Sequence, residues 1–168
     1  NRPSGQERMN MADRFPMTAK GYQELKATLK RLKSVERPAI TLAIEEAREH
    51  GDLSENAEYH AAKEKQAQIE AQIGRLEDLL SNAEIVDTST LGGDRVKFGA
   101  RVTLEEIDSG KIVEYRIVGV GEADISKGTI SYTSPIARGL MNHEVGDEVR
   151  VRVPGGVRTY EISDIRWH

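Results

Sequence analysis

Cysteine is absent from the 168 residues, which excludes disulfide bonds and thiolate metal ligands and fits a cytoplasmic protein. Aromatic residues make up only 5% of the chain and hydrophobic residues 38%, whereas 31% are charged, so two small modules fit better than one large core. No apolar run approaches the length of a membrane span. The net charge of −4 argues against nucleic-acid binding through a broadly basic surface, because such binding depends on neutralising phosphates.

Three stretches of different character divide the chain. Residues 1–15 are polar and lack the apolar centre of a signal peptide, so we expect a disordered extension or a tag. Residues 16–82 carry heptad spacing and predict a coiled-coil hairpin with its tip at 51–55. Residues 83–168 contain short β-branched runs broken by glycine, which predict a small, mostly antiparallel sheet. The expected fold class is therefore α+β.

Mostly apolar residues spaced alternately by three and four form two stripes, as in coiled coils, and each stripe has one polar member. The first consists of Tyr22, Leu25, Leu29, Leu32, Glu36, Ala39 and Ala43, and the second of Tyr59, Ala62, Gln66, Ile69, Ile73, Leu76 and Leu80. In an antiparallel pair of helices, the numbers of two facing residues add up to a nearly constant sum. Tyr22 and Leu80 add up to 102, and Ala39 and Ala62 add up to 101, so the two stripes fit such a pair. Half that sum places the turn at Gly51 and Asp52, and glycine suits a left-handed turn after a helix.

Features along the two predicted arms distinguish the base of the hairpin from its tip. Pro38 removes a helical hydrogen bond, so we expect a bend there. The alanines of the two stripes predict that the arms approach closely near the tip. Residues 18–38 hold six basic and two acidic side chains, a net charge of +4, whereas residues 39–58 hold one basic and six acidic side chains, a net charge of −5. The base is therefore basic and the tip acidic.

Asp52 and Glu55 lie three residues apart at the predicted start of the second helix, so both carboxylates can project from the tip. Carboxylate oxygens are ligands that magnesium prefers. The same spacing is also that of a capping box, which is the commoner interpretation of spacing alone. Two carboxylates without a third ligand bind magnesium weakly, so the tip could at most complete a site whose other ligands belong to a partner.

Other polar residues near the tip allow further interpretations. His50 and His60 do not form a recognised zinc pattern, because cysteine is absent and the spacing is mixed. Arg48 and Lys63 could contact a phosphate backbone. They could equally form the commoner solvated ion pairs with neighbouring glutamates, namely Glu45, Glu49 and Glu64.

The second module is predicted from alternation and turn residues. The expected strands are 84–88, 100–107, 112–118, 129–132, 148–153 and 158–165. Asp108 to Gly110 and Pro154 to Gly156 predict hairpin turns. Ser134 and Pro135 predict the N-cap and first position of a short helix that continues over 136–141. The polar residues Ser134, His143 and Asp147 fit caps and turns better than a catalytic triad.

The stretch 46–62, with the sequence EAREHGDLSENAEYHAA, closely resembles the tip of the bacterial transcript cleavage factors of the Gre family, in its GreA branch. The similarity runs from about Pro16 to the C-terminus. It includes the segments 16–18, 32–38, 80–83, 115–119, 122–124, 134–140 and 154–156.

This resemblance implies a coiled coil that enters the secondary channel of bacterial RNA polymerase and an FKBP-like domain that docks at the channel rim. The chain would then be no enzyme itself but an accessory that stimulates the polymerase's cleavage of backtracked RNA. Asp52 and Glu55 match the family's acidic pair and would help hold a magnesium ion shared with the polymerase and orient water. No stably bound cofactor is expected, and we expect a monomer.

The resemblance also assigns roles to residues outside the acidic pair. Arg48 and Lys63 match basic positions that would contact the 3′ end of the nascent RNA. Asp124, Ser134 and Pro135 match the segments expected to dock on the polymerase.

Three other functions compete with cleavage. A channel-binding inhibitor would have the same shape, but Asp52 and Glu55 match the cleavage-competent pattern. A prolyl isomerase with a chaperone arm needs clustered aromatic residues, and spacing does not show whether those of the second module converge; they are Phe98, Tyr115, Tyr132, Tyr160 and Trp167. An acidic coiled-coil adaptor would carry no chemistry.

Overall fold

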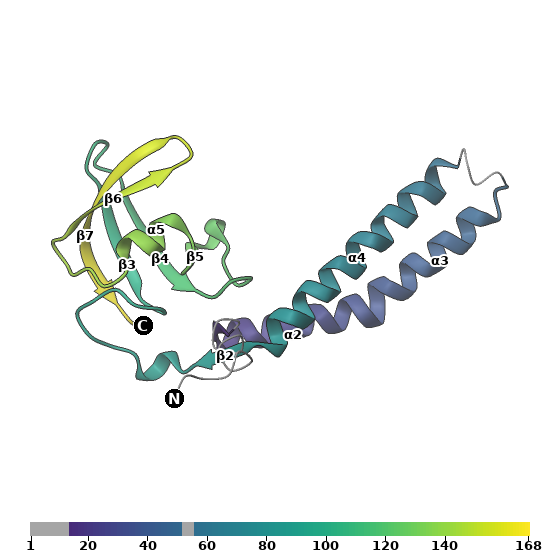
Figure 1. The fold of residues 1–168 in the computed structure, drawn as a ribbon, viewed down its shortest axis with the longest axis horizontal. Coiled ribbons are helices and arrows are strands. Elements are labelled where there is room, and N and C mark those ends of the chain that lie inside the picture. Colours follow the sequence, from purple (N-terminus) through teal and green to yellow (C-terminus); the bar gives the residue numbers. More distant parts are fainter. Residues whose placement is uncertain (1–13, 52–55) are drawn as a thin grey trace, which may run out of the picture. The chain divides into compact units, whose positions relative to one another are not determined.

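The computed structural model describes residues 14–51 and 56–168. Two compact units make up the fold (Figure 1). The hairpin unit contains Tyr22–Ala83, and the β unit combines the described residues up to Gly21 with Glu84–His168. Residues 16–21, which we assigned to the hairpin, group with the β unit in this division. Within the described ranges, no helix has the length and apolar character needed to cross a membrane.

The hairpin unit consists of two antiparallel helical arms, as the heptads predict. Helix α2 (Ala19–Arg31), a π-helical turn (Leu32–Glu36) and helix α3 (Arg37–Arg48) form the first arm, and helix α4 (Ala57–Ser81) forms the second. Figure 1 shows α3 and α4 side by side. The seam buries Leu32, Ile40, Ile44, Ala62, Ile69 and Ile73. Every member of the predicted second stripe is buried or half-buried, which confirms that stripe.

The first stripe is correct as far as the π-helical turn and again at Ala43, which packs against the seam, but not at Ala39. In the π-helical turn the Arg37 N–H donates to the carbonyl oxygen of Leu32, five residues back, so the turn holds one residue more than an α turn. The buried face therefore advances by one position, and Ile40 is 7% exposed whereas Ala39 lies on the exposed face. The predicted place of Ala39 in the seam is wrong. Pro38 lies directly after Arg37 and has no N–H to donate. The π turn therefore lies next to the proline, at the place where we expected a bend.

Ion pairs join the two arms along their exposed edges. Arg37 donates from Nε and from a terminal nitrogen to the two carboxylate oxygens of Glu70, at 2.7 and 2.9 Å. This hydrogen-bonded pair lowers the pKa of Glu70. Lys33 Nζ lies 2.8 Å from Glu77 Oε1. Basic side chains of the first arm thus meet acidic side chains of the second.

The β unit is built on a five-stranded sheet in the order β5-β4-β3-β7-β6. Its strands are β3 (Arg101–Glu106), β4 (Ile112–Val118), β5 (Thr129–Ser131), β6 (Glu148–Val153) and β7 (Gly156–Arg166). Neighbouring strands are antiparallel except β4 and β5, which are parallel. The predicted small sheet with one short helix is therefore confirmed, and one edge strand makes it a mixed sheet.

Turn residues and alternating apolar residues explain this sheet. Gly110 and Gly156 have φ angles of +70° and +128°, so both predicted hairpin turns use a conformation that glycine tolerates. Helix α5 (Pro135–Leu140) begins at the predicted proline and contributes Ala137 and Leu140 to the core. The core contains Val96, Ala100, Val102, Leu104, Ile117, Ile130, Ala137, Leu140, Val149, Val151, Tyr160 and Ile162.

A separate two-stranded sheet pairs β1 (Phe15–Thr18) with β2 (Ala83–Val86). We had placed Phe15 in an N-terminal extension, and the structure includes it in a strand. Two short 3-10 helices, Thr88–Thr90 and Ile125–Lys127, complete the described elements.

Candidate functional site

The hairpin tip begins where α3 ends. Beyond Arg48 the chain turns, and Gly51 N donates to Arg48 O at 3.4 Å. Gly51 has a φ angle of +101°, which confirms the predicted left-handed glycine at the tip. Asp52 and Glu55 follow Gly51 in the sequence and lie outside the described residues.

The side chain of Asn56 joins the two arms next to the tip. Its Oδ1 accepts from Tyr59 N at 3.1 Å, and its Nδ2 donates to Ala47 O at 2.6 Å. One side chain therefore caps α4 and bonds to the last turn of α3. We call this pair of bonds the Asn56 clasp. It was missed in the sequence, although asparagine is a preferred N-cap residue and precedes a helical pattern here.

The clasp decides between two interpretations of the acidic pair. A capping box over Asp52 and Glu55 requires Asp52 to be the N-cap of the second helix. Helix α4 instead begins at Ala57 with Asn56 as its N-cap. The N-cap position that the capping box assigns to Asp52 is therefore occupied by Asn56.

The two candidate RNA-contacting cations lie on the first and second arms near the tip. The Arg48 guanidinium lies 6.0 Å from the centroid of the Tyr59 ring, within the range of a cation–π contact. Lys63 Nζ donates to Gln66 Oε1 at 3.2 Å. Within residues 14–51 and 56–168, neither side chain forms an ion pair. Both positive charges are exposed beside the acidic tip, without the glutamate pairing that was the alternative.

The structure gives no support to His50 and His60 as metal ligands. The His60 ring packs edge-on against Tyr59 with centroids 5.6 Å apart. In the part of the chain that the structure describes, no group of three or more His, Cys, Asp or Glu side chains could hold a metal ion. His50 and His60 are therefore not assigned to zinc.

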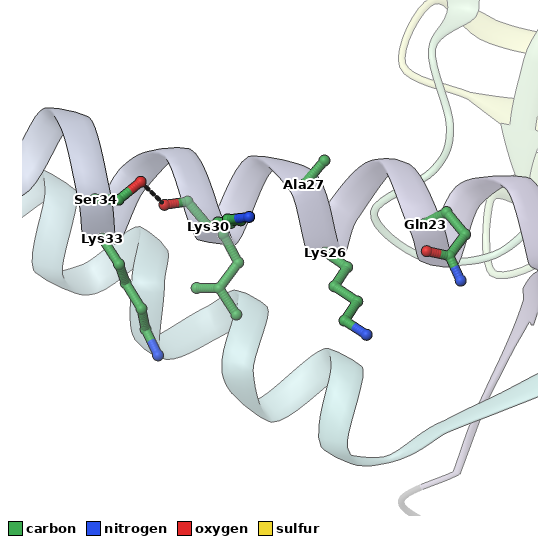
Figure 2. A pocket seen from close by; sticks show the side chains of 7 residues that line it. Gln23, Lys26, Ala27, Lys30, Lys33 and Ser34 are labelled. Atoms are coloured by element: carbon green, nitrogen blue, oxygen red, sulfur yellow. Dashed lines mark hydrogen bonds between the residues drawn. The ribbon is translucent and has the colours of Figure 1, made fainter.

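A basic groove of about 610 Å³ lies along the first arm toward the base of the hairpin. Figure 2 shows Lys26, Lys30 and Lys33 along it, with Ser34 Oγ bonded to the Lys30 carbonyl oxygen at 2.7 Å. Lys33 is paired with Glu77 as described above, whereas Lys26 and Lys30 form no ion pair with any described residue. The groove agrees with the basic base that charge counting predicts.

The three candidate docking residues lie around the edge strand β5. Asp124 caps the 3-10 helix before this strand and accepts from Ser126 N at 3.0 Å and from Ser126 Oγ, and these bonds lower its pKa. Ser134 follows the strand and caps α5, accepting from Ala137 N at 3.3 Å, with Pro135 at the first helical position. Ile125, beside Asp124, is 67% exposed and was not singled out in the sequence.

The remaining polar residues of the β unit serve turns and caps. His143 Nδ1 lies 3.1 Å from Asp147 Oδ2, and the same oxygen accepts from Glu144 N at 2.9 Å. These bonds lower the pKa of Asp147, the backbone bond contributing most. Since Ser134 Oγ is the cap of α5, the three residues fulfil the cap and turn roles that we predicted.

The aromatic residues of the β unit give no support to a prolyl isomerase pocket. Tyr160 is 3% exposed within the core, and Trp167 Nε1 donates to the Gly93 carbonyl oxygen at 3.0 Å. Among the described residues of this unit, Phe98 and Tyr132 form the one ring contact, edge-on with centroids 6.1 Å apart.

Comparison with known proteins identifies two matching family regions. Residues 15–85 match the family described as "Transcription elongation factor, N-terminal". Residues 91–166 match the family described as "Transcription elongation factor, GreA/GreB, C-term". Together these regions cover both units of the fold.

Curated relatives agree with this match. The chain is 55% identical to transcription elongation factor GreA of Phenylobacterium zucineum, over 92% of this chain and 99% of that protein. It is 58% identical to GreA of Acidiphilium cryptum, over 92% and 98%. A crystal structure of GreA factor homolog 1 from Thermus thermophilus is 31% identical over 91% of this chain and 99% of that one, with a TM-score of 0.42. The chain belongs to the GreA/GreB family of transcription elongation factors.

Proposed function

We propose that this chain binds bacterial RNA polymerase, inserts its hairpin tip into the secondary channel and stimulates the polymerase's own cleavage of backtracked nascent RNA. Cleavage frees a new RNA 3′ end and releases arrested complexes. The observation that carries the proposal is the acidic pair, which follows Gly51 at the end of a long hairpin and is not needed to cap α4. The chain acts as an accessory, and the polymerase supplies the active site.

The chemistry of the acidic pair fits a shared magnesium ion. Carboxylate oxygens are ligands that magnesium prefers, and two of them leave positions for ligands from the polymerase and for water. The ion would stabilise charge on the attacking and leaving oxygens of the phosphodiester. Asp52 and Glu55 would each contribute a carboxylate oxygen, and a remaining lone pair would accept a hydrogen bond from the attacking water and orient it.

Arg48 and Lys63 would contact phosphates of the extruded RNA 3′ segment. Both are cationic, exposed and without an ion-pair partner among the described residues. The contact with the Tyr59 ring limits the orientations of the Arg48 guanidinium and holds it near the tip. Two cations would contribute modestly to the electrostatic binding of the RNA backbone and would not recognise its base sequence.

The β unit would dock at the channel rim through the surface around β5. Asp124 offers a carboxylate that is charged at neutral pH, as an aspartate ordinarily is, and whose pKa its bonds to Ser126 lower further. Ile125 adds an exposed apolar side chain next to that charge. Ser134 and Pro135 would form the other end of the same contact, because they follow β5 in the chain.

The test is RNA cleavage in halted polymerase complexes. We expect Asp52→Asn and Glu55→Gln each to lower the rate of stimulated cleavage by at least about 100-fold, the scale on which positioned acid–base and electrostatic groups act. Binding to polymerase should be retained, since the β unit is unchanged. Glu64→Gln is the matched control, because Glu64 is an exposed glutamate of α4 outside the tip motif. Full cleavage by both tip variants would refute the assignment.

Two other results would redirect the assignment. A wild-type chain that binds polymerase and blocks cleavage would be a channel inhibitor. A chain that accelerates isomerisation of a proline peptide and leaves polymerase unaffected would be a prolyl isomerase.

A further inference from the structure

Glu122 occupies an unusual position in the loop after β4. Its carboxylate accepts from Gly119 N at 2.7 Å and from Thr18 N at 3.1 Å, and it also accepts from the Thr18 hydroxyl. Thr18 lies 104 positions away in the sequence, at the N-terminus of α2. One half-buried carboxylate therefore joins the start of the first helix to the end of a strand of the sheet.

Two glycines make room for this carboxylate. A Cβ atom added at Gly21 would lie 1.8 Å from Glu122 Oε1, and one added at Gly119 would lie 2.5 Å from Oε2. Contacts below 3.0 Å force something to move, so neither position accepts a side chain while Glu122 stays in place. At Gly119 the Pro16 carbonyl oxygen would also lie too close to an added Cβ atom. Neither glycine has a positive φ angle, which leaves close approach as the reason for glycine at both.

The electrostatics of a helix N-terminus favour this arrangement. The first N–H groups of a helix have no partner within the helix, and their dipoles attract a negative charge. Thr18 Oγ1 accepts from Gly21 N at 3.0 Å and so caps α2 locally. Glu122 then binds the capping residue itself through its backbone N–H and its hydroxyl. The carboxylate thus holds the whole cap, and with it the first turn of α2.

We propose that Glu122 is a positioning residue that locks the first turn of α2 to the β unit and thereby sets the maximal rate at which a docked factor supports cleavage. The rate part of this inference rests on the proposed function. Helix α2 continues from the locked turn into the hairpin unit. Releasing the turn would loosen the start of the helix that leads to the tip, so docking would stay intact and the saturated cleavage rate would fall.

The lock itself is tested without polymerase, by amide hydrogen exchange of the full chain. In Glu122→Ala, we expect the protection of the Thr18 and Gly119 amides to fall by about tenfold or more, because hydrogen bonds to a charged group are among the stronger ones. Glu122→Gln keeps one acceptor oxygen, so its amide protection should lie between that of the wild type and that of Glu122→Ala. Glu148→Ala is the matched control, an exposed glutamate of the same unit with no ion pair among the described residues. Unchanged protection of both amides in Glu122→Ala would overturn the lock.

The glycine supplies an independent check. Gly21→Ala should lower the unfolding midpoint in the wild-type background, because the new Cβ displaces the carboxylate. In the Glu122→Ala background the same change should be neutral or raise the midpoint, because alanine favours a helix over glycine. This change of sign measures the coupling of the two residues. Equal effects of Gly21→Ala in both backgrounds would contradict the contact.

The positioning role is tested by the dependence of cleavage on factor concentration. We expect Glu122→Ala to lower the cleavage rate at saturation several-fold and to leave the half-saturating concentration within about twofold, with Glu122→Gln in between. If Glu122 were merely structural, its replacement would leave the cleavage rate at saturation unchanged. An unchanged saturated rate in a Glu122→Ala variant that has lost amide protection would therefore overturn the positioning role. If the wild-type chain stimulates no cleavage, the proposed function and the rate claim both fail, and hydrogen exchange still decides whether the lock exists.

Discussion

Among the described residues, the β unit buries twelve core residues beside a five-stranded sheet, whereas the hairpin unit buries six along a seam between two arms. The side chains of the sheet's core come from strands far apart in the sequence, so each is held from several directions. Those of the seam are held between two helices only. The stability of the hairpin therefore depends more on register, caps and edge ion pairs. Arg48, His50 and Gly51, where the first arm ends, are exposed.

The largest expected effect lies in the core of the β unit. Leu104 is fully buried, so Leu104→Ala should destabilise this unit by about 2–5 kcal/mol, the range for a buried leucine that leaves a cavity. Denaturation followed by the fluorescence of Trp167, the one tryptophan of the chain, reports on this unit. Helical circular dichroism should change less, because the long helices belong to the hairpin. Equal loss of both signals would show that the two units unfold together.

A second prediction concerns the register of the hairpin seam. Ile40→Ala should cost about 2–3 kcal/mol, because Ile40 is buried in the seam. Ala39→Ser at the exposed neighbouring position should change stability by no more than about 0.5 kcal/mol. Thermal unfolding followed by helical circular dichroism measures both. A larger loss of stability in Ala39→Ser than in Ile40→Ala would show that the heptads continue without a shift and would contradict the π turn.

The Asn56 clasp should have a smaller effect on stability and a clear effect on activity. Asn56→Ala removes the cap of α4 and the bond to Ala47, so we expect a loss of about 1–2 kcal/mol. Stimulated cleavage should fall several-fold, because the ends of the segment that carries Asp52 and Glu55 are no longer joined. Asn56→Ser keeps an oxygen that can cap α4 and loses the donor to the Ala47 carbonyl. Comparing it with Asn56→Ala therefore separates the effects of the two bonds. A cleavage rate unchanged in Asn56→Ala would remove the clasp from the mechanism.

The smallest effect is expected at the edge pair of Arg37 and Glu70, and it depends on pH. The Arg37 hydrogen bond holds the pKa of Glu70 below its unfolded value, so this pair stabilises the fold above the unfolded pKa. That contribution is lost as the pH falls through the lowered folded value. Glu70→Gln should therefore lower the unfolding midpoint slightly at neutral pH and not in acid. Glu64→Gln on the same helix should show no such pH dependence, and a deficit of Glu70→Gln that persists in acid would exclude the ion pair as its cause.

Periodic patterns predicted much of the fold. The stripe of α4, with Gln66 as its one polar member, is correct throughout, and the bounds of β4 and β6 agree with the alternation of their residues. The stripe of the first arm was wrong at Ala39, because one extra residue in a π turn moves the buried face and leaves no mark in the spacing itself. The parallel pairing of β5 depends on neighbours that are distant in the sequence, so a local pattern could not reveal it.

The candidate site was predicted in a different way. The position of Gly51 followed from the heptads, but the role of Asp52 and Glu55 came from the family resemblance, because their spacing alone favoured a cap. Asn56 could have been found from its preference for helix N-termini. Glu122 could not, because its contact with Thr18 spans 104 positions.

We propose that the hairpin tip supplies the chemistry and the β unit the attachment, and a competition assay tests both parts at once. Increasing amounts of the double variant Asp52→Asn/Glu55→Gln are added to halted polymerase complexes with a fixed, saturating amount of wild-type chain, and RNA cleavage is measured. The account predicts that cleavage falls to about half when the two are equimolar, because the variant binds equally well and is inactive. Cleavage that stays at the wild-type rate under excess variant would contradict it.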